Sequence, residues 1–159
     1  MKKLEYLSKS AAQTQKLAGE VLKETLSIKK RKNGIVLALE GELGGGKTTF
    51  VQGLARALGV KEKITSPTFV ILKRFMIQDS RFKNLYHIDC YRLDNIEDLA
   101  DLGFEEIIKN PENLVVIEWA DKIKSIIPKD AVWVKFEWKE EKKRKIMMDN
   151  SQYPILNFQ

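Results

Sequence analysis

Residues 35–48 read IVLALEGELGGGKT, a short apolar run followed directly by a glycine-rich loop. The run from Ile35 to Leu39 is continuously apolar, which is typical of a strand buried on both faces of a sheet. Gly41 to Thr48 fit G-x-x-x-x-G-K-[ST], the Walker A phosphate loop. From Lys47 to Leu58 the apolar side chains form one stripe, so we expect a helix there. Strand, loop and helix together predict a phosphate-binding α/β unit.

The residue types of this loop suit the phosphates of a nucleotide. Glycines let the backbone turn with its N–H groups pointing inward, and the following helix adds its positive dipole end. Lys47, expected to be exposed in the loop, reaches the β- and γ-phosphates, and the Thr48 hydroxyl is a Mg²⁺ ligand. The residues predicted to bind the nucleotide in this segment are Gly41, Leu43, Gly44, Gly45, Gly46, Lys47, Thr48 and Thr49.

A nucleotide site with magnesium also needs an acidic residue, which in this fold usually ends a buried strand beside the loop. Glu40 directly precedes the loop, and we interpret it as structural. Glu118 follows the apolar run 114–117 and best fits a Walker B position, whereas Asp89 ends the run 86–88 and is the second candidate. One acid would hold Mg²⁺ and the other would orient the attacking water. Thr48 and Glu118 are the pair that we expect to bind the metal, and the residues alone leave open which of Asp89 and Glu118 lies nearer to it.

Two further features, the stretch 65–68 and His87, have two interpretations each, and Cys90 has one. The hydroxyl-rich stretch 65–68 lies where nucleotide hydrolases have mobile switch segments, so Thr65 or Thr68 would sense the γ-phosphate. An ordinary Ser-Pro turn explains the same residues equally well. His87, the only histidine, is interpreted as a core residue rather than a catalyst. Cys90, the only cysteine, is interpreted as a small buried apolar residue.

Apolar patterns elsewhere in the chain extend this unit into an α/β fold, a P-loop NTPase-like mixed sheet flanked by helices. The run 114–117 predicts a second central strand, and alternation at 132–138 predicts a half-exposed one. A charged turn at 139–145 and a return strand at 145–148 would place antiparallel strands at one edge. The other predicted elements are helices at 11–26, 96–102 and 104–108 and strands at 3–7, 69–77 and 85–89.

The composition predicts a folded, cytoplasmic protein. The 159 residues fit a single P-loop ATPase domain over residues 1–159, and the 43% of hydrophobic residues exclude wholesale disorder. The longest purely apolar run, 35–39, is too short to cross a bilayer, and no apolar signal segment follows the basic N-terminus. A single cysteine excludes an internal disulfide and a cysteine-based zinc site.

Ordered motifs along the chain carry a family resemblance. They are GELGGGKTTF at 41–50, SPTF at 66–69, YHIDCYRL at 86–93, LGFEE at 102–106 and IEW at 117–119. The phosphate loop alone occurs in many families, whereas the order of SPTF, H-x-D-x-Y-R and E-W is much more specific. Together the motifs resemble the bacterial TsaE (YjeE) family, the ATPase of tRNA threonylcarbamoyladenosine biosynthesis.

The resemblance implies a compact P-loop ATPase and assigns roles to particular residues. It implies that Lys47 and Thr48 hold the phosphates and Mg²⁺, with Glu118 as the second residue associated with the metal. It also implies that Asp89 and Trp119 are needed for activity. The catalytic residues expected on this basis are Lys47, Thr68, Asp89 and Glu118.

The same resemblance implies an adenine site, a switch and partner proteins. Residues around Ala11 to Thr14 would lie near the adenine of ATP, and Thr68 would lie in a switch-like loop. The family acts with TsaD and TsaB, which make the modification on the adenosine next to the anticodon, so tRNA is met through that complex. The ATPase supports repeated turnover and does not transfer the group itself.

Rival functions come from other classes of protein. A GTPase is disfavoured because the sequence has neither an N-K-x-D base-reading motif nor a D-x-x-G switch. A P-loop small-molecule kinase stays open, although Arg74, Arg81 and Arg92 are dispersed instead of forming a lid.

A basic nucleic-acid-binding module is the non-enzymatic alternative. The net charge of +6 and the basic segments 29–32 and 139–145 favour it, but such charge runs are more often solvated faces. A mixed hypothesis is an ATPase whose 29–32 cluster touches tRNA within an assembly.

Overall fold

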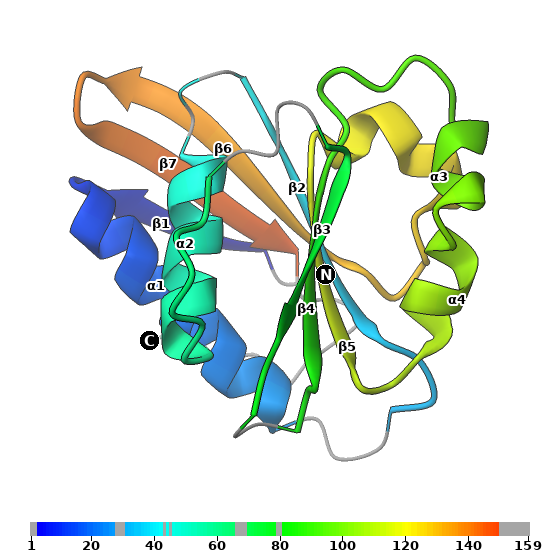
Figure 1. Ribbon diagram of the computed structural model, residues 1–159. Coiled ribbons are helices and arrows are strands. Elements are labelled where there is room, and N and C mark those ends of the chain that lie inside the picture. The colour runs from blue at the N-terminus through cyan, green and yellow to red at the C-terminus, as the bar shows by residue number, and fades with distance from the viewer. Residues whose placement is uncertain are drawn as a thin grey trace.

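The computed structural model describes residues 3–27, 31–42, 44, 46–65, 70–78 and 81–149. These residues form a seven-stranded sheet in the order β1-β7-β6-β2-β5-β4-β3, with helices packed on it (Figure 1). The strands are β1 (Lys3–Ser8), β2 (Ile35–Gly41), β3 (Leu72–Met76), β4 (Asn84–Asp89), β5 (Asn113–Glu118), β6 (Val132–Glu140) and β7 (Lys143–Asp149). The helices are α1 (Ala11–Leu26), α2 (Lys47–Ala57), α3 (Glu97–Asp101), α4 (Phe104–Lys109) and the 3₁₀ helix η1 (Ala120–Ile126).

The sheet is mixed, as the sequence predicts. At its centre β2 is parallel to both β5 and β6, and β5 is parallel to β4. The predicted antiparallel edge is present, because β6, β7 and β1 pair antiparallel in turn. The opposite edge, where β3 pairs with β4, is antiparallel as well. The parallel strands are therefore the inner ones.

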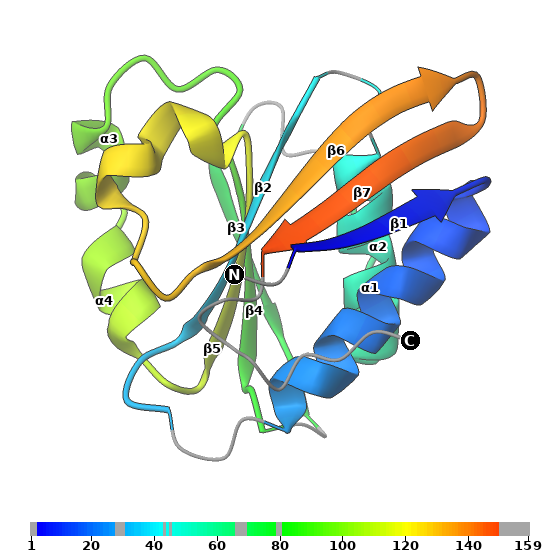
Figure 2. The same ribbon diagram turned by 180° about the vertical axis from the view of Figure 1, so that it is seen from behind.

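Two helical layers cover the sheet from opposite sides. The helices α1 and α2 lie on one face, and α3, α4 and η1 lie on the other (Figures 1 and 2). Along β2, Leu37 contributes to the core under α1 and α2, and Ala38 contributes to the core under the second layer. This double burial is why the strand has no polar alternation. Among the described residues, no helix has both the length and the apolar character needed to cross a membrane.

Helix ends follow the signals in the sequence. Ser10 caps α1, because its side chain accepts a hydrogen bond from the Gln13 N–H. The Gln13 side chain in turn accepts from the Lys9 N–H at 2.7 Å, which satisfies a second backbone donor. After α2, Gly59 adopts the left-handed conformation with φ of 78°, as expected for the residue that follows a helix.

The C-terminal hairpin differs from the prediction. We expected a charged turn at 139–145, but β6 continues to Glu140 and β7 begins at Lys143. The charges lie on the exposed ends of paired strands, where Lys143 and Glu140 form an ion pair at 3.4 Å. The strand expected at 69–77 is also shorter, because β3 covers only Leu72–Met76. The helix η1 has no counterpart in the prediction.

The two helices α1 and α2 approach each other very closely at Gly53. A Cβ atom at this position would lie 2.4 Å from the Cα of Gln15 and 2.5 Å from its carbonyl oxygen. Both clashing atoms belong to the backbone of α1, so they cannot rotate away. A Cβ atom at Gly19, on the same pair of helices, would meet only the Cβ of Ala57, at a comfortable 3.8 Å. Of these two positions, only residue 53 must be glycine for the helices to pack.

Replacing these two glycines by alanine therefore has opposite expected effects. We expect Gly53→Ala to lower the free energy of unfolding by about 1–3 kcal/mol, because overpacking forces the helices apart. We expect Gly19→Ala to be neutral or to stabilise by up to about 1 kcal/mol through helix propensity. Urea unfolding followed by circular dichroism measures both, and equal midpoints for the two variants would contradict this account of the packing.

Candidate nucleotide site

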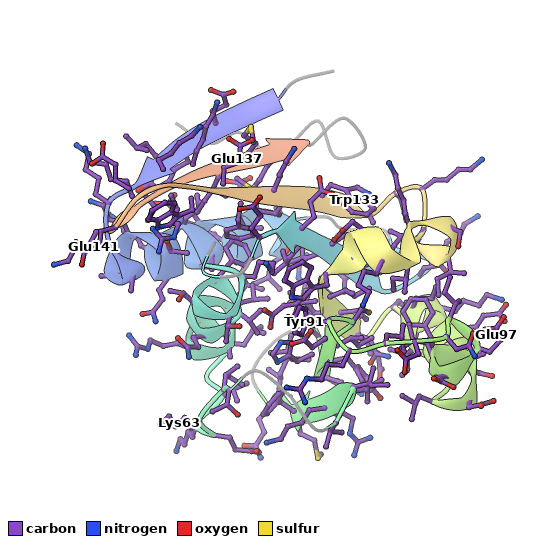
Figure 3. All side chains as sticks on the ribbon, turned by 90° about the horizontal axis from the view of Figure 1, so that it is seen from above. Lys63, Tyr91, Glu97, Trp133, Glu137 and Glu141 are labelled. Atoms are coloured by element: carbon purple, nitrogen blue, oxygen red, sulfur yellow. The ribbon has the colours of Figure 1, made fainter. Side chains whose placement is uncertain are left out.

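The parallel strands bring the predicted site residues to one edge of the sheet. Asp89 ends β4 and Glu118 ends β5, and the two are partners in the register. On the other side Glu118 pairs with Leu39 of β2, the strand that leads into the loop. Figure 3 looks onto this edge from above, with Tyr91 near the centre and Glu141 at the tip of the β6–β7 hairpin.

Two glycines of the loop between β2 and α2, Gly41 and Gly46, have backbone conformations that favour glycine. Gly41 has φ of 143°, and a Cβ there would lie 2.4 Å from the carbonyl oxygen of Phe136 on β6. Gly46 has φ of 99° and precedes α2 without any side chain to cap it. Gly46 therefore offers no side-chain acceptor to the first N–H groups of α2. A helix start that binds phosphate needs these N–H groups without such a cap. The predicted loop residues Leu43 and Gly45 lie outside the described residues.

Lys47 begins α2 and is 5% exposed, so the expectation of an exposed loop lysine is wrong. Its Nζ donates to the carbonyl of Glu42 at 2.9 Å and to that of Gly41, and it lies 4.1 Å from the ring centroid of Trp119. Burial lowers the pKa of Lys47, and nearby carboxylates, first among them Glu118, partly oppose this shift. The site therefore holds a poorly solvated cation beside the loop.

Thr48 and Glu118 contact each other across the site. The Thr48 Oγ1 donates to Glu118 Oε1 at 2.8 Å, although the two residues are 70 positions apart. Glu118 is 2% exposed, and its Oε2 lies 2.6 Å from Nε2 of His87. The pair predicted to hold the metal is thus brought together by the fold.

These two side chains have the chemistry that Mg²⁺ requires. A hydroxyl and a carboxylate are oxygen ligands, and Mg²⁺ is usually held by one or two carboxylates together with phosphates and water. Within the part of the chain that the structure describes, no group of three or more His, Cys, Asp or Glu side chains could enclose a metal. The hydroxyl of Thr48 and the carboxylate of Glu118 are therefore oxygen donors that fit part of a magnesium site.

Asp89 is held beside this pair. It is 8% exposed, and its Oδ1 accepts a hydrogen bond from the Tyr91 N–H at 2.9 Å. The ring of Tyr91 packs against Trp119, with centroids 5.0 Å apart. Trp119 has φ of 58°, the only left-handed non-glycine backbone among the described residues. Such strain is typical of functional sites, and here it accompanies the ring that lies on the Lys47 ammonium.

Cys90 separates Asp89 from Tyr91 and is fully buried. Burial is the main cause that raises the pKa of its thiol to about 12. The thiol therefore stays protonated near neutral pH and has little nucleophilic character. The interpretation of Cys90 as a small apolar residue is confirmed.

A cavity of about 520 Å³ lies beside the loop, between the start of α1 and the tip of the β6–β7 hairpin. Its volume is within the range of small-molecule sites. The hydroxyl of Thr14 is 2.6 Å from that of Ser8, and its methyl carbon faces Gly46. The cavity brings together Ala11, Thr14, Gly44, Gly46 and Thr49 from the prediction with Ser10, Glu141, Lys142 and Arg144.

Arg144 is the residue of this region that sequence reasoning missed. Its Nε donates to the carbonyl of Gly44 at 2.6 Å, and its Nη1 donates to the carbonyls of Glu140 and Lys143 at 2.9 and 3.0 Å. These hydrogen bonds hold the tip of the β6–β7 hairpin against the loop between β2 and α2. The available signal was the alternation on β7, because Arg144 continues the face of buried Ile146.

The predicted switch segment is only partly covered by the structure. Thr65 is exposed. Thr68 lies outside the described residues, as do Ser66 and Pro67.

The chain has a P-loop NTPase-like α/β fold, in which a mixed sheet carries the Walker A sequence between a central strand and a helix. A family model described as "Threonylcarbamoyl adenosine biosynthesis protein TsaE" matches residues 8–146. The chain belongs to the TsaE family, whose members are proteins of tRNA threonylcarbamoyladenosine biosynthesis.

Individual relatives agree with the family match, and each bears the name "tRNA threonylcarbamoyladenosine biosynthesis protein TsaE". The Treponema pallidum protein is 43% identical over 101 residues, which cover 64% of this chain and 71% of that protein. The Bacillus subtilis protein is 38% identical over 103 residues, covering 65% and 61%. The Rickettsia felis protein is 36% identical over 149 residues, covering 92% and 81%.

A solved structure agrees with the sheet and its helices. The crystal structure of YdiB from Bacillus subtilis superposes with a TM-score of 0.74 and 28% sequence identity, over 98% of this chain and 91% of that one. The expected fold class is confirmed.

Loss of the Arg144 side chain should loosen the hairpin tip. In Arg144→Gln we expect faster amide hydrogen exchange at Gly44 and around residues 139–144. Stability should fall by only about 1 kcal/mol, because water can replace the exposed hydrogen bonds of the guanidinium. Lys142→Gln is the matched control, because Lys142 lines the same cavity and is exposed. Mass spectrometry of deuterium uptake makes the comparison, and equal uptake in Arg144→Gln and wild type would show that the contact does not restrain the loop.

Proposed function

We propose that this protein binds ATP with Mg²⁺ and hydrolyses it, in support of repeated turnover of the tRNA threonylcarbamoyladenosine modification. The observation that supports this most is the 2.8 Å hydrogen bond between Thr48 of the Walker A loop and the strand-end acid Glu118. Buried Lys47 lies at the same point of the site. The proposal treats residues 1–159 as a single P-loop ATPase domain acting in the cytoplasm.

The phosphates would lie at the start of α2. Burial removes most of the water around the Lys47 ammonium. The attraction between this ammonium and a phosphate oxygen is therefore less screened than it would be on the surface. The carbonyls of Gly41 and Glu42 that now accept from Nζ are exchanged for phosphate oxygens. The N–H groups of the first helical turn add further donors.

Thr48 and Glu118 would hold the magnesium ion, which neutralises charge on the phosphates when it is bound. Asp89 would orient the attacking water, because it is the register partner of Glu118 and the Tyr91 N–H holds its carboxylate beside the site. A carboxylate is the kind of acceptor that positions a water molecule. Thr68 stays a predicted sensor of the γ-phosphate.

The base would occupy the 520 Å³ cavity beside the loop. Ala11 and Thr14 present small apolar groups at one wall, and the Gly44 and Gly46 backbone joins that wall to the phosphate loop. A flat base against methyl groups suits adenine, whereas the chain lacks the guanine-reading motif. The expected contacts of Ala11, Thr14 and Thr49 with the nucleotide are consistent with this placement.

Partner proteins would supply an arginine side chain that stimulates hydrolysis. TsaD and TsaB are the partners implied by the family resemblance, and tRNA would be met through their complex. The guanidinium of Arg144 is bound by backbone carbonyls instead of being held free over the loop. We therefore expect slow hydrolysis by the isolated protein, because stimulation by an arginine from a partner is common among such enzymes.

Phosphate release from Mg·ATP in the absence of any acceptor tests the proposal and separates hydrolysis from the kinase alternative. We expect Lys47→Met to reduce this rate by about 10²- to 10³-fold, as for loss of one preorganised charge in an active site. Methionine keeps most of the side-chain volume against Trp119, so the fold should survive, which circular dichroism checks. Lys61→Met, an exposed lysine beyond α2, is the control. A folded Lys47→Met protein with the wild-type rate would reject the assignment.

Substitutions of the two strand-end acids, Glu118 and Asp89, should impair hydrolysis in different ways. Glu118→Gln is expected to raise the Mg²⁺ concentration needed for half-maximal rate, because it weakens a metal ligand. Asp89→Asn is expected to lower kcat by about 10²- to 10⁴-fold with nucleotide binding retained, since it keeps the acceptor for the Tyr91 N–H and loses the charge. Steady-state kinetics across Mg²⁺ concentrations separate the two signatures. Normal turnover in both variants would refute both roles.

A further inference from the structure

His87 lies inside the site and not in an unrelated part of the core. It is on β4, two residues before Asp89, and it is fully buried. Its register partner on parallel β5 is Val116, so Glu118 follows two positions later on the same face of the sheet. The pairing brings Nε2 of His87 to 2.6 Å from Oε2 of Glu118.

The two oxygens of the Glu118 carboxylate have different partners. Oε1 accepts from the Thr48 hydroxyl at 2.8 Å, and Oε2 faces the His87 ring. Rotation of the carboxylate breaks both contacts, so the two partners together fix its plane. A buried carboxylate needs such partners, because an oxygen without a hydrogen bond costs free energy in the interior.

The ring of His87 has a preferred tautomer for the same reason. Within the part of the chain that is described, its buried Nδ1 has no hydrogen-bond partner. A proton on Nδ1 would be a buried donor with no acceptor, whereas a proton on Nε2 meets the carboxylate of Glu118. The arrangement favours the Nε2–H tautomer, which leaves only a lone pair at Nδ1.

We propose that His87 is a positioning residue: its Nε2–H donates to Glu118 Oε2 and holds the carboxylate so that Oε1 faces Thr48. This role rests on the proposed function, because it orients the side chain that would share the metal with Thr48. Hydrogen bonds to metal-ligating carboxylates are a general means of fixing their orientation. His87 itself touches neither nucleotide nor metal in this account.

The tautomer can be tested on the wild-type protein without any nucleotide. The chain contains one histidine, so an untagged ¹⁵N-labelled sample gives a single set of imidazole signals. We expect a protonated Nε2 and a bare Nδ1, with the Nε2 signal shifted in Glu118→Gln. The proposal would be overturned if the proton lies on Nδ1, or if the imidazole signals of His87 do not shift in Glu118→Gln.

Two variants then separate positioning from packing. The amide nitrogen of glutamine corresponds to Nε2 of histidine, and that of asparagine corresponds to Nδ1, so only His87→Gln can replace the donor to Glu118. We expect His87→Asn to raise the Mg²⁺ concentration for half-maximal hydrolysis by about 10- to 100-fold, the range found when such supporting hydrogen bonds are lost. We expect His87→Gln to restore most of that loss.

The same variants have a readout apart from hydrolysis. Calorimetry with a non-hydrolysable ATP analogue should show weaker binding for His87→Asn only when Mg²⁺ is present. Equal Mg²⁺ dependence of His87→Asn and His87→Gln would overturn the positioning role. If neither variant folds, the tautomer measured on the wild-type protein decides whether the positioning role stands. A wild-type protein without Mg²⁺-dependent hydrolysis would instead refute the proposed function, so the two failures are distinguishable.

Discussion

The hydrogen bond between Thr48 and Glu118 joins the two halves of the candidate site. Thr48 belongs to the first turn of α2, and Glu118 is the last residue of β5. Their 2.8 Å contact exists only because β2 and β5 pair in a register that sets Leu39 opposite Glu118. Both strands are buried on both faces, so the hydrophobic core determines where the polar groups meet.

The site combines buried groups of both charges. Lys47 lies over the Trp119 ring and donates to loop carbonyls, while burial lowers its pKa and the surrounding carboxylates counteract this. Glu118 is held by Thr48 and His87 in the same region. Groups kept out of water in fixed orientations interact strongly with an incoming ion, because little reorganisation is needed when it binds. The strained backbone of Trp119 adds to this rigid arrangement.

Much of the fold could be predicted because its signals are local. The continuous apolar run of β2 determines structure within a few residues, and the strand predicted from it is confirmed. The capping pair Ser10 and Gln13 of α1 is an equally local signal. The Walker A spacing likewise predicted where the helix α2 begins. Contacts between distant segments could not be read in this way. The bond between Arg144 and Gly44 joins residues 100 positions apart.

The same distinction explains what could not be predicted around the site. The burial of Lys47 results from the Trp119 ring, and the contact of His87 with Glu118 results from the β4–β5 register. Neither is visible in the spacing of a single segment. The charged stretch 139–145 was interpreted as a turn because alternating charges resemble a solvated loop, whereas pairing with the neighbouring strand makes it extended.

The central claim is that the loop, Lys47 and the Thr48–Glu118 pair form one site for a nucleotide with its metal. Calorimetric titration of a non-hydrolysable ATP analogue into the folded wild-type protein, with and without Mg²⁺, tests it most directly. We predict saturable binding of one analogue per chain that is much tighter with Mg²⁺ present. No heat of binding in either condition, or identical affinity in both, would contradict the claim.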